Sequence, residues 1–547
     1  MDKKIKICVI QLTRIGDILQ TYVAAKQLRS ENSNIELTLI TRRKFSTQLR
    51  FLLKEAFEHI IEFETKDFLD KSNINLREAL VNTHNFIHDI KKNDYDLIVN
   101  LSFNKSSSYL TTLIANKLKM GLYRNEKAQL GINDKWSQFV YSNVMESSNC
   151  PINIIDIFKG ILGAKETFAT DFKTPKNKVI TIHPFASHKR KMWDSSKWTN
   201  LIEKILQSDK EIEINLVGAP NETSKAKEII DAPTLKIFNK RILNVVGKNS
   251  VEDTFNMLSE SHLFIGHDSM VSHLAGILRM PSVVLSLGTV KPHETTPYND
   301  RVINLSPKIK CFPCQLETSC ELMPCHKSLN ISTVMSVVSL YLNDKEISTK
   351  NLLQLSSPLE LDSVRITKAS FDVGGLALSE VTDNLTNTTD SFKSFYRLIW
   401  NYYFRDIEVN CDIPKVSADT EKMLVHHLEG TKHLFEIYSH GFQFCNQILD
   451  ESEKDSPSVP IIHERVEKLN EIDSLVSTTK NAFPQLAPLA DFFFVHKANA
   501  IGDNIIEITN SNLLAFHEAT NLTAIINDLL TKTVGPQVNQ NERIKEA

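Results

Sequence analysis

The sequence predicts two successive α/β domains, each built on a mainly parallel sheet, followed by a mainly α-helical domain. Three observations lead to this prediction. β-rich apolar runs alternate with amphipathic helical segments, the alternation pauses once and restarts, and it stops near residue 345. Such alternation is typical of right-handed βαβ units. We therefore expect domains at residues 1–172, 173–345 and 346–547.

The first domain opens with a strand and a helix. Residues 5–12 form a β-rich apolar run, and apolar residues recur at helical spacing over residues 18–29. An amphipathic segment follows at residues 47–57. The further strands that we expect in this domain lie at residues 35–41 and 95–101.

The second domain begins after a polar, Pro-containing segment at residues 172–177, which we predict to be a linker. Strands and helices then alternate again. The expected strands are residues 179–183, 212–218, 263–266 and 282–287, and the expected helices are residues 196–207, 222–230 and 271–278. Two Rossmann-like halves of this kind face a cleft at the carboxyl ends of their strands, where such folds bind ligands.

The third region has no βαβ rhythm. Residues 421–435 and 513–530 have helical patterns, and residues 455–460 contain a Ser- and Pro-rich break. The run 392–407 is rich in aromatic residues. We predict that these aromatics form the core of a helical accessory domain; the alternative is a peripheral contact with a membrane.

Composition excludes several classes of protein. The formal net charge is −3, which gives no reason to expect a nucleic-acid partner. The N-terminal apolar run is too short and too alternating for a signal peptide, and no stretch approaches the roughly 18 apolar residues of a membrane span. We therefore expect a cytoplasmic protein without a transmembrane segment.

The first candidate for catalysis lies at the first strand-to-helix junction. Gly16 allows a tight turn, and Asp17 falls in the first turn of the helix. At this junction the carboxylate would project into the cleft. The alternative role is a helix cap, because carboxylates are favoured at helix N-termini.

Two polar loops follow strands of the second domain. One contains Ser187 and the cations Lys189, Arg190 and Lys191. Three consecutive cations after a strand are suited to bind a diphosphate, and the alternative is a solvated basic loop. The other ends in Glu222, where a carboxylate can accept ribose hydroxyls or cap a helix.

A third loop of the second domain carries the most specific pattern. Asp268 and Ser269 stand between a strand and a helix whose N-terminus is a ready anion site. Ser269 adds a hydroxyl, and His273 adds a second donor one turn later.

Four of the eight cysteines fall within fifteen residues, as Cys311, Cys314, Cys320 and Cys325. Four thiolates on one loop, here residues 311–325, can enclose a tetrahedral zinc or iron ion. The alternative is a group of reduced, partly buried thiols.

Together these motifs resemble the bacterial heptosyltransferases of glycosyltransferase family 9 over about residues 5–340. The resemblance rests on four motifs in the same order, each at a strand-to-helix junction: Gly16-Asp17, Lys191-x-Trp193, the 218–222 loop and the 268–275 loop. It implies a GT-B fold with an acceptor-side first domain and a donor-binding second domain.

The resemblance also implies residue roles. Asp17 is the implied general base. The implied donor-binding residues are Ser187, Lys191, Glu222, Asp268, Ser269 and His273. Met270 stands where the family has Gly, and a Met there would shift the phosphate or narrow the pocket. The donor's identity therefore stays open.

The implied function is inverting transfer of a sugar, in this family usually heptose from ADP-heptose, to a hydroxyl of a lipopolysaccharide-type glycan or a protein. No carboxylate-rich metal motif accompanies the basic loop, so we expect no catalytic metal. The alternative function is a non-catalytic nucleotide-sugar-binding protein, or a scaffold that acts or forms oligomers through the helical domain.

Overall fold

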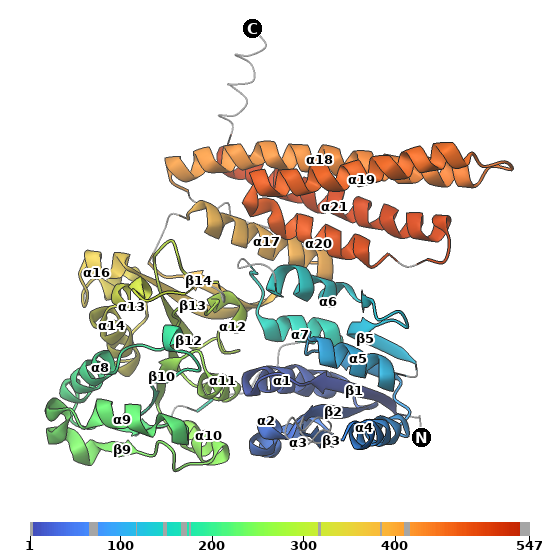
Figure 1. Cartoon of the computed structure of the whole chain (residues 1–547). Coiled ribbons are helices and arrows are strands. Elements are labelled where there is room, and N and C mark those ends of the chain that lie inside the picture. The colour runs from blue at the N-terminus through green and yellow to red at the C-terminus, as the bar shows by residue number, and fades with distance from the viewer. Residues whose placement is uncertain are drawn as a thin grey trace, which may run out of the picture. The chain divides into compact units, whose positions relative to one another are not determined.

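A computed structural model describes residues 4–64, 75–115, 117–145, 150–165, 172–173, 175, 177–315, 319–382, 386–409, 416–500 and 502–535 (Figure 1). The chain divides into two compact units. The first comprises Met1–Leu130 with Ile152–Thr382, and the second comprises Gly131–Pro151 with Asp383–Ala547. The first unit contains both α/β halves, and the second is helical.

The first half is a six-stranded sheet in the order β3-β2-β1-β4-β5-β6. Its strands are β1 (Ile5–Gln11), β2 (Ile35–Arg42), β3 (His59–Phe63), β4 (Leu97–Asn100), β5 (Leu118–Arg124) and β6 (Leu130–Ile132). Its helices are α1 (Ile15–Glu31), α2 (Arg43–Ser46), α3 (Arg50–Ala56), α4 (Leu76–Lys91), α5 (Lys105–Ile114) and α7 (Ile154–Leu162). The β1 strand is central and pairs in parallel with β2 and β4, which explains the apolar run at residues 7–10 within it.

The second half is an eight-stranded sheet in the order β14-β13-β12-β11-β10-β7-β8-β9. Its strands are β7 (Val179–His183), β8 (Glu213–Leu216), β9 (Ile242–Asn244), β10 (Leu263–His267), β11 (Ser282–Leu285), β12 (Val302–Pro307), β13 (Val364–Asp372) and β14 (Gly375–Glu380). Its helices are α8 (Ser195–Ser208), α9 (Thr223–Ile230), α10 (Val251–Ser259), α11 (Met270–Ile277), α12 (Pro292–Thr295), α13 (Pro324–Ser328), α14 (Ile331–Leu342), α15 (Thr349–Leu352) and α16 (Pro358–Asp362). The predicted GT-B class, with two α/β halves and a helical region, is confirmed.

The β13–β14 hairpin lies where the sequence predicts helical structure. It pairs antiparallel with β12 and so extends the second sheet. The last strands of this sheet therefore come from beyond the predicted boundary at residues 345/346, and the helical unit starts near residue 383 instead. Alternating buried and exposed residues in β13 and the two-residue Val373-Gly374 turn explain the hairpin.

A buried polar cluster ties α7 of the first half to the second half. The Asp156 carboxylate accepts the Tyr298 hydroxyl at 2.5 Å and the backbone N–H of Leu376 at 2.8 Å. Lys159 donates to the Tyr298 hydroxyl at 3.1 Å. Asp156 is fully buried, so these partners compensate the loss of its hydration. The cluster holds the hairpin and both halves in one compact unit.

The helical unit contains α6 (Lys135–Phe139), a π-helix (Val140–Met145), α17 (Thr388–Arg405), α18 (Ala418–Ser452), α19 (Val459–Ala482), α20 (Ala487–Ala498) and α21 (Ile505–Val534). The long helices α18, α19 and α21 lie side by side (Figure 1). Phe395, Tyr396 and Trp400 of α17 are buried, which confirms that the aromatic run forms a core. The inserted segment joins this core, because Phe139 contacts Trp400 with ring centroids 5.1 Å apart.

Most strands and helices expected in the α/β region are present with boundaries shifted by a few residues. The predicted linker at residues 172–177 lies partly outside the described residues, and its described positions are neither helix nor strand. Within the described part of the chain, no helix has the length and apolar character needed to cross a membrane.

Candidate functional site

The predicted base lies at the N-terminus of α1. Asp17 occupies the third position of the helix, and its Oδ2 accepts the backbone N–H of Arg14 at 3.0 Å. One carboxylate oxygen therefore caps the helix, as the alternative interpretation expects. Capping and proton transfer are compatible, because a carboxylate has two oxygens and several lone pairs.

The N-terminus of α1 lies against α11 of the second half. A β-carbon on Gly16 would be only 3.6 Å from Cδ2 and 3.9 Å from Nε2 of His273. Glycine thus lets the turn approach the imidazole closely. Burial lowers the pKa of His273, and the negative charges of Asp268 and Asp17 oppose this shift. The structure therefore brings Asp17 and His273, predicted from separate motifs, to one place.

Lys191, Asp268 and His273 form a compact charged cluster. Lys191 Nζ donates to Asp268 Oδ2 at 2.8 Å, and His273 Nε2 lies 3.8 Å from Asp268 Oδ1. The three side chains are 17%, 10% and 8% exposed. Burial alone would raise the pKa of Asp268, but Lys191 and His273 hold it below its ordinary value. His273 Nδ1 is buried and has no hydrogen-bond partner among the described residues.

Ser269 and Glu222 are joined through a residue that sequence reasoning missed. His183, the last residue of β7, has Nδ1 at 3.0 Å from the Ser269 hydroxyl and Nε2 at 3.6 Å from Glu222 Oε2. The same Glu222 oxygen accepts the Ala219 N–H at 2.7 Å. Burial would raise the pKa of Glu222, but His183 and this backbone bond lower it. A buried polar residue at a strand's carboxyl end is a signal that could have identified His183.

A second missed histidine fixes the basic loop. His267 of β10 is fully buried; its Nε2 accepts the backbone N–H of Trp193 at 2.9 Å, and its Nδ1–H donates to the Leu285 carbonyl at 3.2 Å. Burial lowers the pKa of His267 to about 3, so the ring is neutral at physiological pH. A neutral ring is required, because only an unprotonated Nε2 can accept that hydrogen bond.

Within the basic loop the three cations have different environments. Lys189–Lys191 form a short 3₁₀ turn, in which Lys191 reaches Asp268 and Lys189 is exposed. The Arg190 guanidinium donates to the Gln315 carbonyl at 3.2 Å. Ser187 is exposed and precedes this turn. Lys191 therefore differs from a residue of a solvated basic loop, because it makes a specific contact with Asp268.

The four clustered cysteines lie close enough to influence one another. The pKa of Cys314 is raised by burial and by the neighbouring thiols of Cys325, Cys311 and Cys320. The Cys325 sulfur accepts backbone N–H groups of Gly288 and His326. Among the described residues, no group of three or more His, Cys, Asp or Glu side chains is arranged to hold a metal ion. The soft donor set nevertheless suits zinc or iron, and N–H···S bonds are the kind of outer contact that supports bound thiolates.

A large cavity of about 840 Å³ lies in the first half, beside the turn that leads to Asp17. Thr13 and Arg14 of that turn line it. Apolar side chains from β3, α4 and α5 form much of the remaining wall, together with Arg42, the last residue of β2. The cavity thus lies at the carboxyl ends of the parallel strands, the usual ligand position in such folds.

Comparison with known proteins agrees with this geometry. Residues 83–324 match the family model "Glycosyltransferase family 9 (heptosyltransferase)". Lipopolysaccharide heptosyltransferase 1 of Campylobacter coli is 23% identical over 300 residues, covering 51% of this chain and 83% of that protein. The family resemblance is therefore confirmed for the matched segment, and the chain is a glycosyltransferase.

Solved structures of low sequence identity also match. Escherichia coli ADP-heptose lipopolysaccharide heptosyltransferase II has a TM-score of 0.46 at 13% identity, covering 62% of this chain and 99% of that one. The iron-containing dodecameric glycosyltransferase TibC of enterotoxigenic E. coli has a TM-score of 0.37 at 12% identity, covering 63% and 77%.

Proposed function

We propose that the protein transfers heptose from ADP-heptose to an acceptor hydroxyl with inversion at the sugar carbon. The observation that carries this proposal is the meeting of Asp17 from the first half with Lys191, Asp268 and His273 of the second. This arrangement supplies a carboxylate base from the first half and a cationic site for the leaving group from the second half. Direct displacement at the sugar carbon uses both.

The donor diphosphate would bind where β7 and β10 end. Lys191 would exchange its contact with Asp268 for the diphosphate, and the N-terminus of α11 would add backbone N–H groups and a favourable dipole. Ser269 caps this helix and is positioned by His183. These donors stabilise the negative charge that develops on the leaving diphosphate.

The nucleoside would lie along the loop that follows β8. Glu222 is ionised, because its pKa is lowered, and it can accept hydroxyl protons of a ribose. Ser187 would add a hydroxyl to the phosphates from the loop after β7. His273 Nδ1, which lacks a protein partner among the described residues, is a further contact for the donor.

Asp17 would act as the general base. It would remove the proton of the acceptor hydroxyl while that oxygen attacks the anomeric carbon, and ADP would leave from the opposite face. A single displacement of this kind inverts the configuration.

The acceptor would occupy the 840 Å³ cavity of the first half. Its walls are largely apolar, with Arg14 and Arg42 as the charged groups among the lining residues. This lining favours an acceptor that presents an apolar portion and an acidic group beside its hydroxyl. A lipopolysaccharide-type glycan or a protein can carry both.

A structural metal is a further part of the proposal. Cys311, Cys314, Cys320 and Cys325 would hold one zinc or iron ion, which would stabilise the loop that follows β12. Four thiolates fill a tetrahedral shell and leave no position for substrate, so the site would have no direct part in sugar transfer.

Mass spectrometry tests the function directly. The full chain is incubated with candidate lipopolysaccharide-type and protein acceptors and with ADP-heptose, ADP-glucose or UDP-glucose. We expect a mass increase of one heptose with ADP-heptose. Transfer of another sugar in its place would refute the donor assignment, and absence of transfer to every acceptor would favour the non-catalytic alternative.

A further inference from the structure

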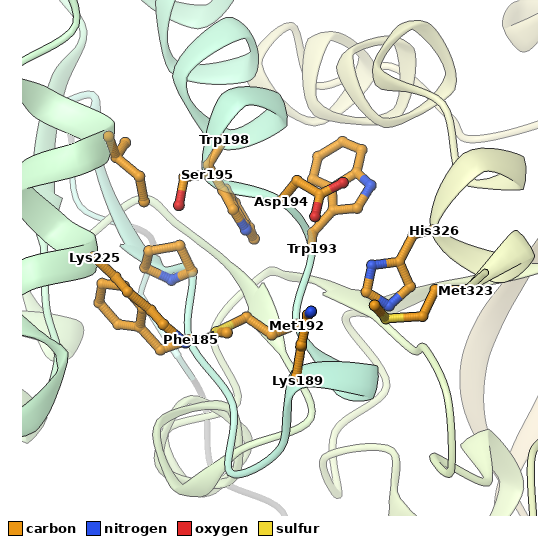
Figure 2. A pocket seen from close by; sticks show the side chains of 12 residues that line it. Phe185, Lys189, Met192, Trp193, Asp194, Ser195, Trp198, Lys225, Met323 and His326 are labelled. Atoms are coloured by element: carbon orange, nitrogen blue, oxygen red, sulfur yellow. Dashed lines mark hydrogen bonds between the residues drawn. The ribbon is translucent and has the colours of Figure 1, made fainter. Parts of the chain in front are cut away.

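A second cavity, of about 240 Å³, lies in the second α/β half (Figure 2). Its apolar wall includes Phe185, Met192, Trp198 and Ile229. The residues assigned above to the donor do not line it. The cavity is therefore distinct from the proposed donor site, although both use the loop between β7 and α8.

Two residues of the cavity wall carry a buried indole N–H without a partner in the described part of the chain. The indole N–H groups of Trp193 and Trp198 have no acceptor among the described residues, and the two side chains are 2% and 0% exposed. Figure 2 shows the Trp198 nitrogen directed toward the middle of the lining side chains. A buried donor without a partner is unfavourable, and a ligand acceptor would remove that cost.

Positive charge converges on the same cavity. Lys189 and Lys225 line it, and Lys225 Nζ lies 3.5 Å from Met192 Sδ. The N-terminus of α8 also opens there, because Ser195, its first residue, is part of the wall. Asp194, the carboxylate of the wall, precedes the helix but makes no side-chain capping bond. A helix N-terminus with two lysines and an indole N–H favours an anion.

We propose that this cavity binds a small oxyanion carried on an apolar or aromatic body, such as a phosphate monoester or a carboxylate. The oxygens would accept from Trp198 Nε1–H and pair with Lys225 and Lys189. The body would pack between Phe185 and Met192. A bare inorganic anion fits less well, because most of the wall is apolar.

An occupant would also act on the donor-binding loop. Lys189 and Met192 line the cavity and flank Lys191, so a ligand there would hold both sides of the lysine that contacts Asp268. This consequence rests on the proposed function, whereas the binding site itself does not. Binding can therefore be measured without donor or acceptor.

Calorimetry and intrinsic tryptophan fluorescence of the full chain test the proposal, with phenyl phosphate, benzoate and inorganic phosphate as probes. We expect saturable binding of at least one aromatic probe, tighter than inorganic phosphate by about tenfold or more, with a change in tryptophan emission. Phenyl phosphate and benzoate separate the two anion classes.

Variants locate the binding. Trp198→Phe, which removes the N–H, and Lys225→Met should each weaken the aromatic probe about tenfold. The matched control is Lys227→Met, because Lys227 is exposed on the same helix and does not line the cavity. Lys225→Met changes an exposed residue and so keeps the test valid if Trp198→Phe fails to fold.

Three results would overturn the proposal. One is absence of saturable binding of either aromatic probe, and another is equal weakening by Lys225→Met and Lys227→Met. The third is displacement of the probe by ADP together with loss of binding in Lys191→Met, since the cavity would then be part of the donor site.

Discussion

The two α/β halves prepare their ligand sites in opposite ways. In the second half, charged and polar side chains at the ends of β7, β8 and β10 already contact one another, as in the Lys191–Asp268 pair. In the first half, a cavity of about 840 Å³ with largely apolar walls lies beside the turn that leads to Asp17. Under the proposed function, the second half would supply a preformed site for one kind of group, a phosphate, whereas the first half would supply volume and a base.

Replacing the base should have the largest effect. Asp17→Asn keeps a side-chain oxygen that can cap α1 but removes the proton acceptor. Turnover should fall by about two to four orders of magnitude with little loss of stability. Steady-state kinetics and a thermal melt of the same sample check this. Near-normal turnover would mean that Asp17 only caps α1 and that the first half supplies no catalytic base.

The cysteine cluster should dominate the stability of the second half. Elemental analysis of protein purified without added metal should show about one zinc or iron per chain, and Cys320→Ser should lose it together with several kcal/mol of folding free energy. Cys445→Ser, in the helical unit, is the control and should keep the metal. Four freely titrating thiols in the folded chain would disprove the metal site.

Lys191 should distinguish a specific contact from a basic loop. Lys191→Met should weaken donor binding about 10- to 100-fold, the effect expected for a charge-assisted contact, while Lys189→Met should change it little. Because removal of Lys191 leaves the buried Asp268 carboxylate without its nearest cation, the double variant Lys191→Met/Asp268→Asn controls for stability. Equal losses in both lysine variants, by calorimetry, would mean that the charge acts diffusely.

His267 should make the second half acid-sensitive by a smaller amount. Its pKa is about 3 in the folded protein, far below its ordinary value of 6.5. As pH falls below 6.5, the unfolded chain binds a proton that the folded chain does not, so stability falls by about 1.4 kcal/mol per pH unit. Urea unfolding between pH 7 and 5 measures this slope. His267→Gln should reduce it, and an unchanged slope would assign it to other groups.

The local motifs predicted from sequence agree with the structure where they depend on strand ends. Asp17, Lys191, Glu222 and Ser269 all lie at strand-to-helix junctions. These junctions are predictable from the sequence because an apolar strand precedes each of them. The pairing of Lys191 with Asp268 was not predictable, since 77 residues separate them and only the β7–β10 pairing brings them together.

Other features were missed for identifiable reasons. His183 and His267 belong to strands and resemble core residues in sequence. Their hydrogen-bonding roles become visible only when the structure shows which strand ends and loops lie next to them. The sequence predicts a helical region where the β13–β14 hairpin lies, because no βαβ alternation marks a strand that is added antiparallel. Phe139 joins the aromatic core of α17 across more than 200 residues, a contact without local signal.

Hydrogen–deuterium exchange with ADP-heptose tests most directly whether the second half alone forms the donor site. We expect the strongest protection in residues 183–193, 218–223 and 266–276, with little change around the first-half cavity in α4 and α5. Protection centred on that cavity, or none at the three loops at saturating donor, would contradict it.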